Sequence, residues 1–571
     1  MLTRWLGSAL RSLRDYFAEQ EPTFWPAFTP ALVVSALLFV RSPLSNYIFD
    51  EQEALLANPY VNGNGTAFWD ALRRDFWGLP PERSIGSYRP IPNLVWRALW
   101  RVSQLPFLHH WVNVVGHAVN GALVASLSLT LTRDRSLSWL AGGCFVACAV
   151  LTEAVSGVVG IADVLGGLGV LTAIAALRLP MWAMPGGVFL GLSFGLFSKE
   201  SAIVGVPLIG WAALVSAPAF HEKPRRLLRA LMAVVAACAA LFVYTEVRRH
   251  FFPVSVAHEL AAPLPRDTPW LEQSLQQFLR WFRQPQLPND PINNPLGSAE
   301  PAHRIAGALR VYARGLGQLL FPWKLSGDYS FPQEPVPTKL LFSGSIAGAF
   351  LLVALPLLGL CSWVYSLIRE RRWSDGSAPA LGRLRAVAFG AMWLPVAYFP
   401  HSNIAVLLPT VRAERFWYLP AFGSALLLAV VLQQCLAQCR PRVGVTLVSA
   451  FFAVQMLQAR SHACDYSDDL TFWRSTRRAV PNSAKAHLNY SVMVGARGDL
   501  QERLQANRRA LELAPEWAMA HVYYGDTLCR MRQPEKGWPH YKTGFELSPN
   551  DPNLIALGLQ CLWDQHAIEA R

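Results

Sequence analysis

Long apolar segments separated by short polar loops dominate the first 460 residues of the chain. A helix that crosses a membrane needs about 20 apolar residues. On this criterion we expect eleven membrane spans, at 28–44, 109–131, 137–152, 157–178, 184–198, 201–219, 227–247, 341–368, 384–400, 416–435 and 443–459. The pattern therefore predicts an all-α membrane domain over residues 1–460.

The distribution of Lys and Arg predicts the orientation of these spans, because short loops rich in them stay on the cytoplasmic side. The basic loop residues that fall on the side of the N-terminus are Arg133, Arg135, Arg178, Lys223, Arg225, Arg226, Arg229, Arg369, Arg371, Arg372, Arg383, Arg385, Arg440 and Arg442. We therefore expect a cytoplasmic N-terminus. An odd number of spans then places the outer loops 45–108 and 248–340, and the C-terminal region, outside. The apolar stretch 304–322 would break this alternation, so we expect a helix lying on the outer membrane face and ended by Pro322.

The pattern changes after residue 480, where a regular period appears. Pro481, Pro515 and Pro549 are 34 residues apart. A 34-residue helix–turn–helix unit with Pro at its end is typical of tetratricopeptide repeats, which stack into an array. We therefore expect a linker at 461–480 and repeats at 481–571. The repeats would bind an acceptor protein or peptide, or else serve as a stabilising cap or dimer contact.

Composition supports a membrane protein and excludes several other classes. Hydrophobic residues make up 52% of the 571 residues and charged residues 16%, whereas soluble chains carry roughly 25% charged residues. The mean hydropathy is +0.24, which excludes disorder as the main state. Nine Cys are too few for a disulfide scaffold. The net charge of +13 lies mostly in short loops, so no nucleic-acid partner is expected.

Two adjacent acids, Asp50 and Glu51, follow the first predicted span directly. A carboxylate at the membrane surface is a functional candidate by default. A glycosyltransferase that uses a lipid-linked donor needs a general base, which removes the proton from an acceptor hydroxyl as it attacks the sugar. We predict that this pair is catalytic. The alternative is that Asp50 only caps the next helix.

The same loop carries Asp75, Trp77, Tyr88 and Arg89. Trp and Tyr suit a sugar-stacking surface as well as the aromatic belt at a membrane interface. Arg89 could bind a phosphate in bidentate fashion or anchor the loop to lipid headgroups.

Four further charged residues lie near the ends of predicted spans: Glu153, Asp163, Lys199 and Glu200. A short loop could bring Glu153 and Asp163 to one mouth of the bundle. Buried pairs of this kind often only fix helices together, which is the alternative to substrate binding.

A charged cluster of Arg412, Glu414 and Arg415 stands immediately before the tenth predicted span. The arginine fork matches phosphate oxygens, and the N-terminus of a helix adds its dipole. We expect the arginines to hold the phosphate of a lipid donor and Glu414 to orient one of them. The alternative is an ordinary juxtamembrane cluster, but basic residues on the outer side run against the charge rule.

Other catalytic motifs are absent from the sequence, which has no HExxH, Walker-type loop, CxxC or GxSxG motif. No metal is required. An Mg or Mn ion bridging Asp50, Glu51 and a phosphate is the form a metal site would take. One disulfide could form among Cys464, Cys529 and Cys561, and the sequence does not select the pair.

Several strings resemble the transmembrane and tetratricopeptide-repeat protein O-mannosyltransferases, members of the C-type glycosyltransferase superfamily. The matching strings are FDEQEALLANPYV (49–61), DFWG (75–78), SYRPIPNLVWR (87–97), HHWVNVVGHAVNGALV (109–124), LTEAVSGVVGIADVLGGL (151–168), SKESAIVGVPLI (198–209), LFPWKLSGDYS (320–330), FPHSNI (399–404) and AERFWYLPAFGSALLLA (413–429). Together with the repeats they cover nearly the whole chain.

The resemblance implies a polyprenyl-phosphate mannose donor, a protein Ser or Thr hydroxyl as acceptor, and an active site on the extracytoplasmic face. It places the family's acidic pair on Asp50 and Glu51. Several relatives have Asp-Asp there, so Asp50 is the better candidate base. The Arg-rich composition indicates a bacterial inner-membrane protein, whose carrier would be undecaprenyl phosphate. The repeat array is shorter than in the animal members, which leaves the acceptor class open.

The resulting prediction has two sets of residues besides the catalytic pair. The donor-phosphate residues are Arg89, Arg412, Glu414 and Arg415, and the substrate-binding residues are Asp75, Trp77, Tyr88, Glu153, Asp163, Lys199, Glu200 and Asp328. One alternative keeps this chemistry but uses a lipid or polysaccharide acceptor. A second is a non-enzymatic membrane scaffold that recruits partners through the repeats. A transporter is disfavoured, because transporters tend to show paired repeats around a midplane site.

Overall fold

A computed structural model describes residues 16–17, 19–41, 45–63, 66–216, 225–262, 264–265, 268–372 and 379–566. Over these residues the chain is helical and contains no β-strand, which confirms the all-α prediction. Lys223, used above to orient the chain, lies outside the described residues.

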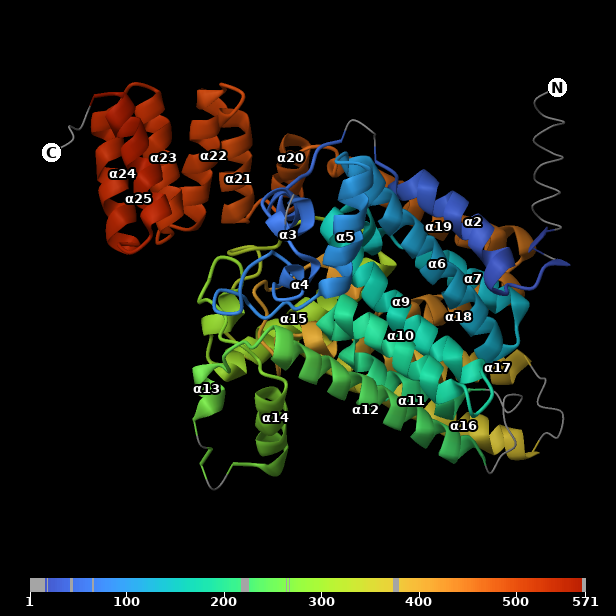
Figure 1. The fold of residues 1–571 in the computed structure, drawn as a ribbon. Coiled ribbons are helices and arrows are strands. Elements are labelled where there is room, and N and C mark those ends of the chain that lie inside the picture. Colours follow the sequence, from blue (N-terminus) through green and yellow to red (C-terminus); the bar gives the residue numbers. More distant parts are fainter. Residues whose placement is uncertain are drawn as a thin grey trace.

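Every predicted span corresponds to a helix of the main bundle (Figure 1). These helices are α2 (Phe24–Phe39), α6 (Pro106–Thr132), α7 (Arg135–Val146), α9 (Ile161–Ala175), α10 (Met184–Ser198), α11 (Gly205–Val215), α12 (Arg225–Phe251), α16 (Ser343–Arg372), α17 (Pro379–Tyr398), α18 (Ala421–Gln438) and α19 (Pro441–Asp465).

The number of membrane crossings is supported only in part. Six helices of the described chain are long and apolar enough to span a membrane: Pro106–Thr132, Val158–Arg178, Leu227–Phe251, Ser343–Glu370, Ala421–Gln438 and Pro441–Asp465. The helices Arg135–Val146 and Ala149–Ser156, bent by 42°, add a seventh if they form one span. The other predicted spans include the shorter apolar helices Phe24–Phe39, Met184–Ser198 and Glu200–Val215. The count of eleven therefore stays a prediction.

Burial separates the helices into a core and an outer ring. In the most apolar window of Val158–Arg178, 78% of the residues are buried, against 17% in Ser343–Glu370. Helices α9 and α10 pack closely because both carry glycine: a Cβ on Gly169 would lie 2.3 Å from the Cα of Gly195. This contact brings the start of α9 beside the end of α10, where Asp163 and Lys199 lie.

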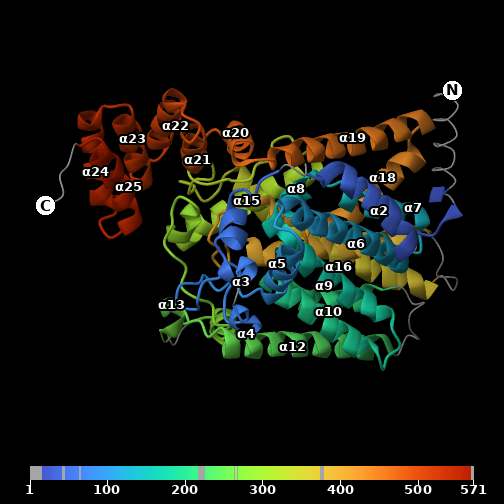
Figure 2. The same ribbon diagram turned by 45° about the horizontal axis from the view of Figure 1, so that its top comes forward.

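Two long loops connect these helices and carry short helices of their own. The first holds α3 (Pro59–Asn62), α4 (Phe68–Ala71) and α5 (Pro90–Val102). The second holds α13 (His258–Ala261), α14 (Trp270–Trp281) and α15 (Pro301–Leu320). The 304–322 stretch is thus helical, as predicted, and α15 packs against α16. Helices α3 and α20 lie at the end of the bundle that carries the C-terminal helices, whereas α13 lies away from α20 (Figures 1 and 2).

The C-terminal helices repeat with the predicted period. They are α20 (Asp469–Ala479), α21 (Ala484–Gly495), α22 (Leu500–Leu513), α23 (Ala518–Arg530), α24 (Pro534–Leu547) and α25 (Pro552–Asp564). Helices α21, α23 and α25 begin 34 residues apart, and so do α22 and α24. Side-chain caps begin several of them: Ser483 accepts from Ala486 N and Asp499 accepts from Glu502 N. Pairs α21–α22 and α23–α24 form packed hairpins.

Two features of the C-terminal region were not fixed by the sequence. The expected linker 461–480 contains the end of α19 and all of α20, whose Phe472 and Trp473 are buried. Cys529 and Cys561 form a disulfide between α23 and α25, and Cys464 is a free, exposed thiol.

Candidate active site

Asp50 lies at a sharp turn that the C-terminal helix α20 holds in place. The preceding residue, Phe49, has a φ of 45°, in the left-handed region that non-glycine residues rarely adopt. Its ring stacks on Phe472 at 5.8 Å and meets the edge of Trp473 at 5.0 Å between centroids. Its backbone N–H donates to Asp469 Oδ1 at 2.9 Å. Side chains from the far end of the chain therefore set the direction of Asp50.

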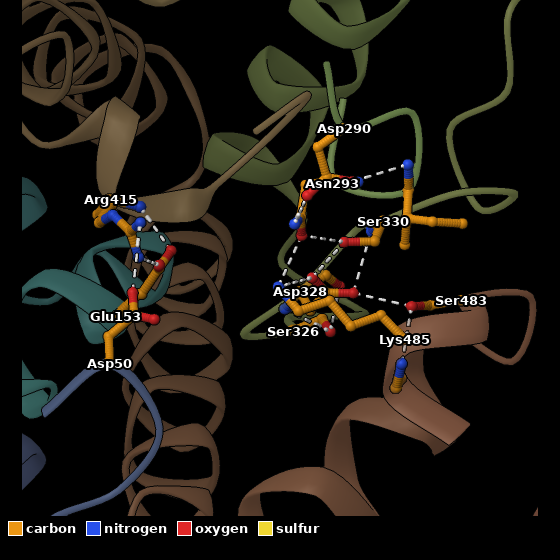
Figure 3. Close-up of polar contacts among 12 residues, drawn as sticks. Asp50, Glu153, Asp290, Asn293, Ser326, Asp328, Ser330, Arg415, Ser483 and Lys485 are labelled. Carbon is orange, nitrogen blue, oxygen red and sulfur yellow. Dashed lines mark hydrogen bonds and ion pairs between the residues drawn. The ribbon is translucent and has the colours of Figure 1, made fainter. Parts of the chain in front are cut away.

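Three residues converge beside this turn: Asp50, Arg415 and Glu153 (Figure 3). Nη2 of Arg415 lies 3.9 Å from Oδ2 of Asp50. The backbone N–H of Arg415 donates to Glu153 Oε2 at 2.8 Å, and its Nη1 forms an ion pair with Glu153 Oε1. Glu153 lies on α8 (Thr152–Ser156) and Arg415 on the short helix η9 (Glu414–Trp417). The structure thus brings together three residues that are remote in sequence.

Exposure distinguishes the members of this triad. The side chains of Asp50 and Arg415 are 22% and 24% exposed, against 6% for Glu153. They line a pocket with Gly327, Tyr466 and Phe472, among other residues. Asp50 and Arg415 are therefore the more accessible charged residues of the pocket, and Glu153, which also lines it, is largely buried against Arg415.

The charge of Arg415 is secured by its neighbours. Burial opposes the charged form, but the carboxylates of Glu153, Asp50 and Asp163 outweigh it and raise the pKa of Arg415 above its ordinary value. The guanidinium is a permanent cation beside a partly exposed carboxylate.

Two further ion pairs continue inward from this site. Lys199 pairs with Asp163, and both side chains are buried. Arg89 forms a bidentate pair with Glu200, with Nε to Oε2 at 2.7 Å and Nη2 to Oε1 at 2.8 Å. These contacts match the alternative in which such residues fix helices together. Glu200 engages the Nε and Nη2 donors of Arg89, so Arg89 could offer a phosphate only its remaining N–H groups, and its predicted role in phosphate binding stays a prediction.

Glu51, the second member of the predicted catalytic pair, lines the same pocket as Asp50 but is engaged by other partners. It is 2% exposed and forms an ion pair with Arg41 at 3.2 Å. Its two oxygens accept from the backbone N–H of Ile48 at 3.0 Å and of Val158 at 2.8 Å. Glu51 therefore fastens the first outer loop to the bundle, and adjacent residues of the loop face in different directions.

Asp75 organises a turn of the first loop rather than the pocket. It is buried and accepts from the backbone N–H of Trp77 at 2.9 Å and Leu79 at 2.7 Å, and from Ser84 Oγ at 2.6 Å. Trp77 is partly buried and packs against an apolar cluster shared by the loop and the bundle, and Tyr88 is 1% exposed. These side chains contribute to packing, and their role in substrate binding stays a prediction.

Arg412 and Glu414 support the second outer loop. Nη1 of Arg412 lies 2.6 Å from Glu334 Oε1, and its guanidinium covers the ring of Tyr329 at 4.1 Å. Glu414 Oε1 accepts from Ser326 N at 2.7 Å and from Tyr329 Oη at 2.5 Å. Of the predicted cluster, only Arg415 reaches Asp50. Glu414 orients the loop instead of an arginine.

Asp328 ties the second outer loop to the first hairpin of the C-terminal region. It accepts from Ser330 Oγ at 2.6 Å and from Ser483 Oγ at 2.8 Å (Figure 3). Lys485 lies 3.8 Å from the same carboxylate and donates to Asn293 Oδ1 at 2.7 Å. Asp328, predicted to bind substrate, thus forms with Ser483 and Lys485 a polar joint between the second outer loop and helix α21.

Sequence reasoning missed three residues that shape the pocket: Gly327, Tyr466 and Phe472. A Cβ on Gly327 would lie 2.2 Å from Cζ of Phe472, so glycine permits the close packing of the loop on α20. The signal that could have found them is the string DYSDDLTFW after the last span, which places aromatic and acidic residues just outside the membrane.

The described residues contain no group of three or more His, Cys, Asp or Glu side chains placed to hold a metal ion. Asp50 faces Arg415, whereas Glu51 faces Arg41. The acidic pair therefore does not fit the predicted bridging site for Mg or Mn. A positive charge is supplied at this place by Arg415.

Comparison with known proteins gives distant homology over most of the chain. Protein O-mannosyl-transferase TMTC1 of Homo sapiens is 24% identical over 526 aligned residues, which cover 87% of this chain and 56% of that protein. Protein O-mannosyl-transferase TMTC3 of Mus musculus is 24% identical over 91% of this chain and 54% of that protein. Protein O-mannosyl-transferase Tmtc2 of Drosophila melanogaster is 32% identical over 216 residues, 35% of this chain and 23% of its own length. The chain thus spans little more than half the length of the first two relatives.

No protein-family profile matches the chain. Among solved structures, the archaeal oligosaccharyltransferase AglB from Archaeoglobus fulgidus, in complex with an inhibitory peptide and a dolichol-phosphate, aligns with 81% of this chain and 59% of that chain. The TM-score is 0.38 at 13% identity, which is too low to support an argument. The sequence homology and the candidate spans together identify an integral membrane protein that is distantly related to the transmembrane protein O-mannosyltransferases.

Proposed function

We propose that this distant relative of the protein O-mannosyltransferases is a membrane glycosyltransferase. It transfers a sugar, mannose by analogy with those relatives, from a polyprenyl-phosphate donor to Ser or Thr hydroxyls of extracytoplasmic proteins. The observation that carries this proposal is the partly exposed Asp50 beside the permanent cation Arg415, in a pocket formed by both outer loops and α20.

The reaction needs one proton acceptor and one stabilising cation. The acceptor oxygen attacks the anomeric carbon of the sugar while the bond from that carbon to the phosphate oxygen breaks. The hydroxyl proton goes to Asp50 as general base. The bonding electrons leave with the polyprenyl phosphate, whose growing negative charge Arg415 stabilises. A single displacement of this kind inverts the anomeric centre.

The supporting residues explain why one arginine suffices for this role. Glu153 holds Arg415 through both its backbone N–H and its guanidinium, so the cation is preorganised. The second Nη of Arg415 remains directed toward Asp50. In this proposal Arg415 is the cation that meets the leaving phosphate.

An extracytoplasmic site is supported by two independent observations. The charge rule assigns the short loops rich in Arg to the cytoplasmic side, which leaves the loop that carries Asp50 on the opposite side. The disulfide between Cys529 and Cys561 is typical of oxidising compartments. The 34-residue hairpins would act as tetratricopeptide repeats that present an acceptor segment to the pocket.

A transfer assay tests the proposal. Purified protein in detergent would receive radiolabelled polyprenyl-phosphate mannose and a periplasmic protein extract. Wild type and Glu53→Gln, a neighbouring exposed carboxylate of the same loop, should label protein, and Asp50→Asn should not. Label on lipid or polysaccharide would change the acceptor class. No label with mannose or other lipid-linked sugars would favour the scaffold alternative.

A further inference from the structure

The residue that places Asp50 belongs to the C-terminal region rather than to the membrane domain. Asp469 is the first residue of α20 and accepts two hydrogen bonds from the base-bearing loop. Oδ1 accepts from Phe49 N at 2.9 Å, and Oδ2 accepts from Gln52 Nε2 at 2.6 Å. The two bonds bracket Asp50 on both sides in sequence.

The turn that these bonds hold is intrinsically unfavourable. The left-handed conformation of Phe49 is strained for a non-glycine residue and persists only where the surroundings enforce it. The aromatic rings of Phe472 and Trp473 hold its side chain from one face. Nζ of Lys485, on α21, lies 5.1 Å from the centre of the same ring. These contacts of Phe49 all come from residues 469–485, whereas Glu51 ties the loop two residues further on to the bundle through Arg41 and Val158.

We propose that Asp469 is a positioning residue for the transfer reaction, so that α20 and the first hairpin are part of the catalytic unit. This inference rests on the proposed function of Asp50. Without the bond to Phe49 N–H, the turn relaxes and the carboxylate of Asp50 moves away from the pocket. A displacement of about 1 Å at a reacting group can lower the rate about 100-fold.

The chain supplies matched variants for a test. Asp469→Ala removes both acceptors, whereas Asp469→Asn keeps one carbonyl oxygen that can accept from Phe49 N–H. Asp468→Asn removes the neighbouring charge but keeps an N-cap. Asp468 accepts hydrogen bonds from Thr471 and Ser467 and lies 3.9 Å from the partly exposed Arg497, and none of these contacts is with the loop that carries Asp50. Gln52→Ala removes one bond at the exposed edge and serves if Asp469→Ala does not fold.

Two measurements are made on each variant. Hydrogen–deuterium exchange of the backbone over 45–63 reports the tether without any substrate. Transfer kinetics give kcat and the KM for the lipid donor. We expect Asp469→Ala to speed exchange at Phe49 and to lower kcat about tenfold or more while leaving KM unchanged. Asp469→Asn should restore most of both properties, and Asp468→Asn should behave as wild type.

The outcomes separate this inference from the proposed function. Unchanged exchange at Phe49, an unchanged kcat in Asp469→Ala, or an equal loss in Asp468→Asn would overturn the positioning role. If the wild type transfers no sugar, the proposed function fails. Faster exchange at Phe49 in Asp469→Ala would then show that Asp469 tethers the loop without serving transfer, which would refute its positioning role.

Discussion

Nη2 of Arg415 lies 3.9 Å from Oδ2 of Asp50, although the two residues lie at opposite ends of the membrane domain in sequence. Asp50 comes from the first outer loop, and Arg415 is held through its backbone N–H and its guanidinium by Glu153. In the proposed reaction Asp50 is the general base and Arg415 the cation that meets the leaving phosphate.

Replacement of the proposed base should abolish most transfer. Asp50→Asn keeps the size of the side chain but cannot accept a proton, and general-base catalysis typically contributes about 10²–10⁴-fold in rate. We expect a kcat loss of that order with little change in the melting temperature, because the side chain is partly exposed. Initial rates with labelled donor measure this. A general base should account for at least about a 100-fold loss. A variant that keeps more than about a tenth of the wild-type kcat would therefore exclude Asp50 as the base.

Arg415→Lys tests the shape of the cation rather than its charge. A lysine cannot contact Glu153 and reach toward Asp50 together, because it lacks the planar fork. Removal of one preorganised donor in an active site costs about 10²–10³-fold in kcat. We expect a loss in that range in the transfer assay. A lysine variant with normal kcat would show that the cation is not used in this way.

Glu51 should matter for stability and not for chemistry. Glu51→Gln leaves the buried guanidinium of Arg41 without its carboxylate, and breaking a buried pair costs about 3–5 kcal/mol. We expect a clearly lower melting temperature in detergent. The variant molecules that remain folded should have the wild-type kcat. The double variant Arg41→Met/Glu51→Leu should recover part of the loss. A normal melting temperature with lost activity would return Glu51 to the catalytic pair.

The second outer loop should lose stability in acid through Glu334. Burial alone would raise its pKa, but the guanidinium groups of Arg412, Arg314 and Arg310 outweigh burial and lower the pKa. The unfolded carboxyl has a pKa of about 4.3, so this stabilisation is complete above that value and is lost as pH falls through the lower folded pKa. The melting temperature of the wild type should therefore fall more steeply below about pH 4 than the melting temperature of Glu334→Gln. Parallel curves would contradict this.

The disulfide should stabilise the end of the C-terminal array. Cys529 and Cys561 join α23 to α25 across 32 residues, and a native disulfide typically contributes about 2–4 kcal/mol. We expect Cys529→Ser to make residues after α22 more sensitive to limited proteolysis, and reduction of the wild type to have the same effect. Cys464→Ser, at an exposed free thiol, is the control and should leave the digestion pattern unchanged.

The sequence predicted the fold better than the site. Apolar segment length indicated a helix at each of the eleven predicted spans, and proline spacing gave the 34-residue period of α21 to α25, but α5, α14 and α20 were not predicted. Asp50 and Arg415 could be found because charged residues are rare at the ends of apolar segments. The different directions of Asp50 and Glu51 could not be found, because the intervening backbone depends on the conformation of Phe49. That conformation is set by Asp469, which lies 420 positions further along the chain.

The joint formed by Asp328, Ser483 and Lys485 determines where the chain can be divided. An exchange of the repeats near residue 465, at the apparent end of the last span, would replace α20 and α21. It would separate the loop that carries Asp50 from Asp469 and Lys485, which contact it. A cut between α22 and α23 would leave the joint and the first hairpin intact. Repeats exchanged from α23 onward would have to keep an acid at position 526, because the buried Arg503 of α22 pairs with Asp526 of α23.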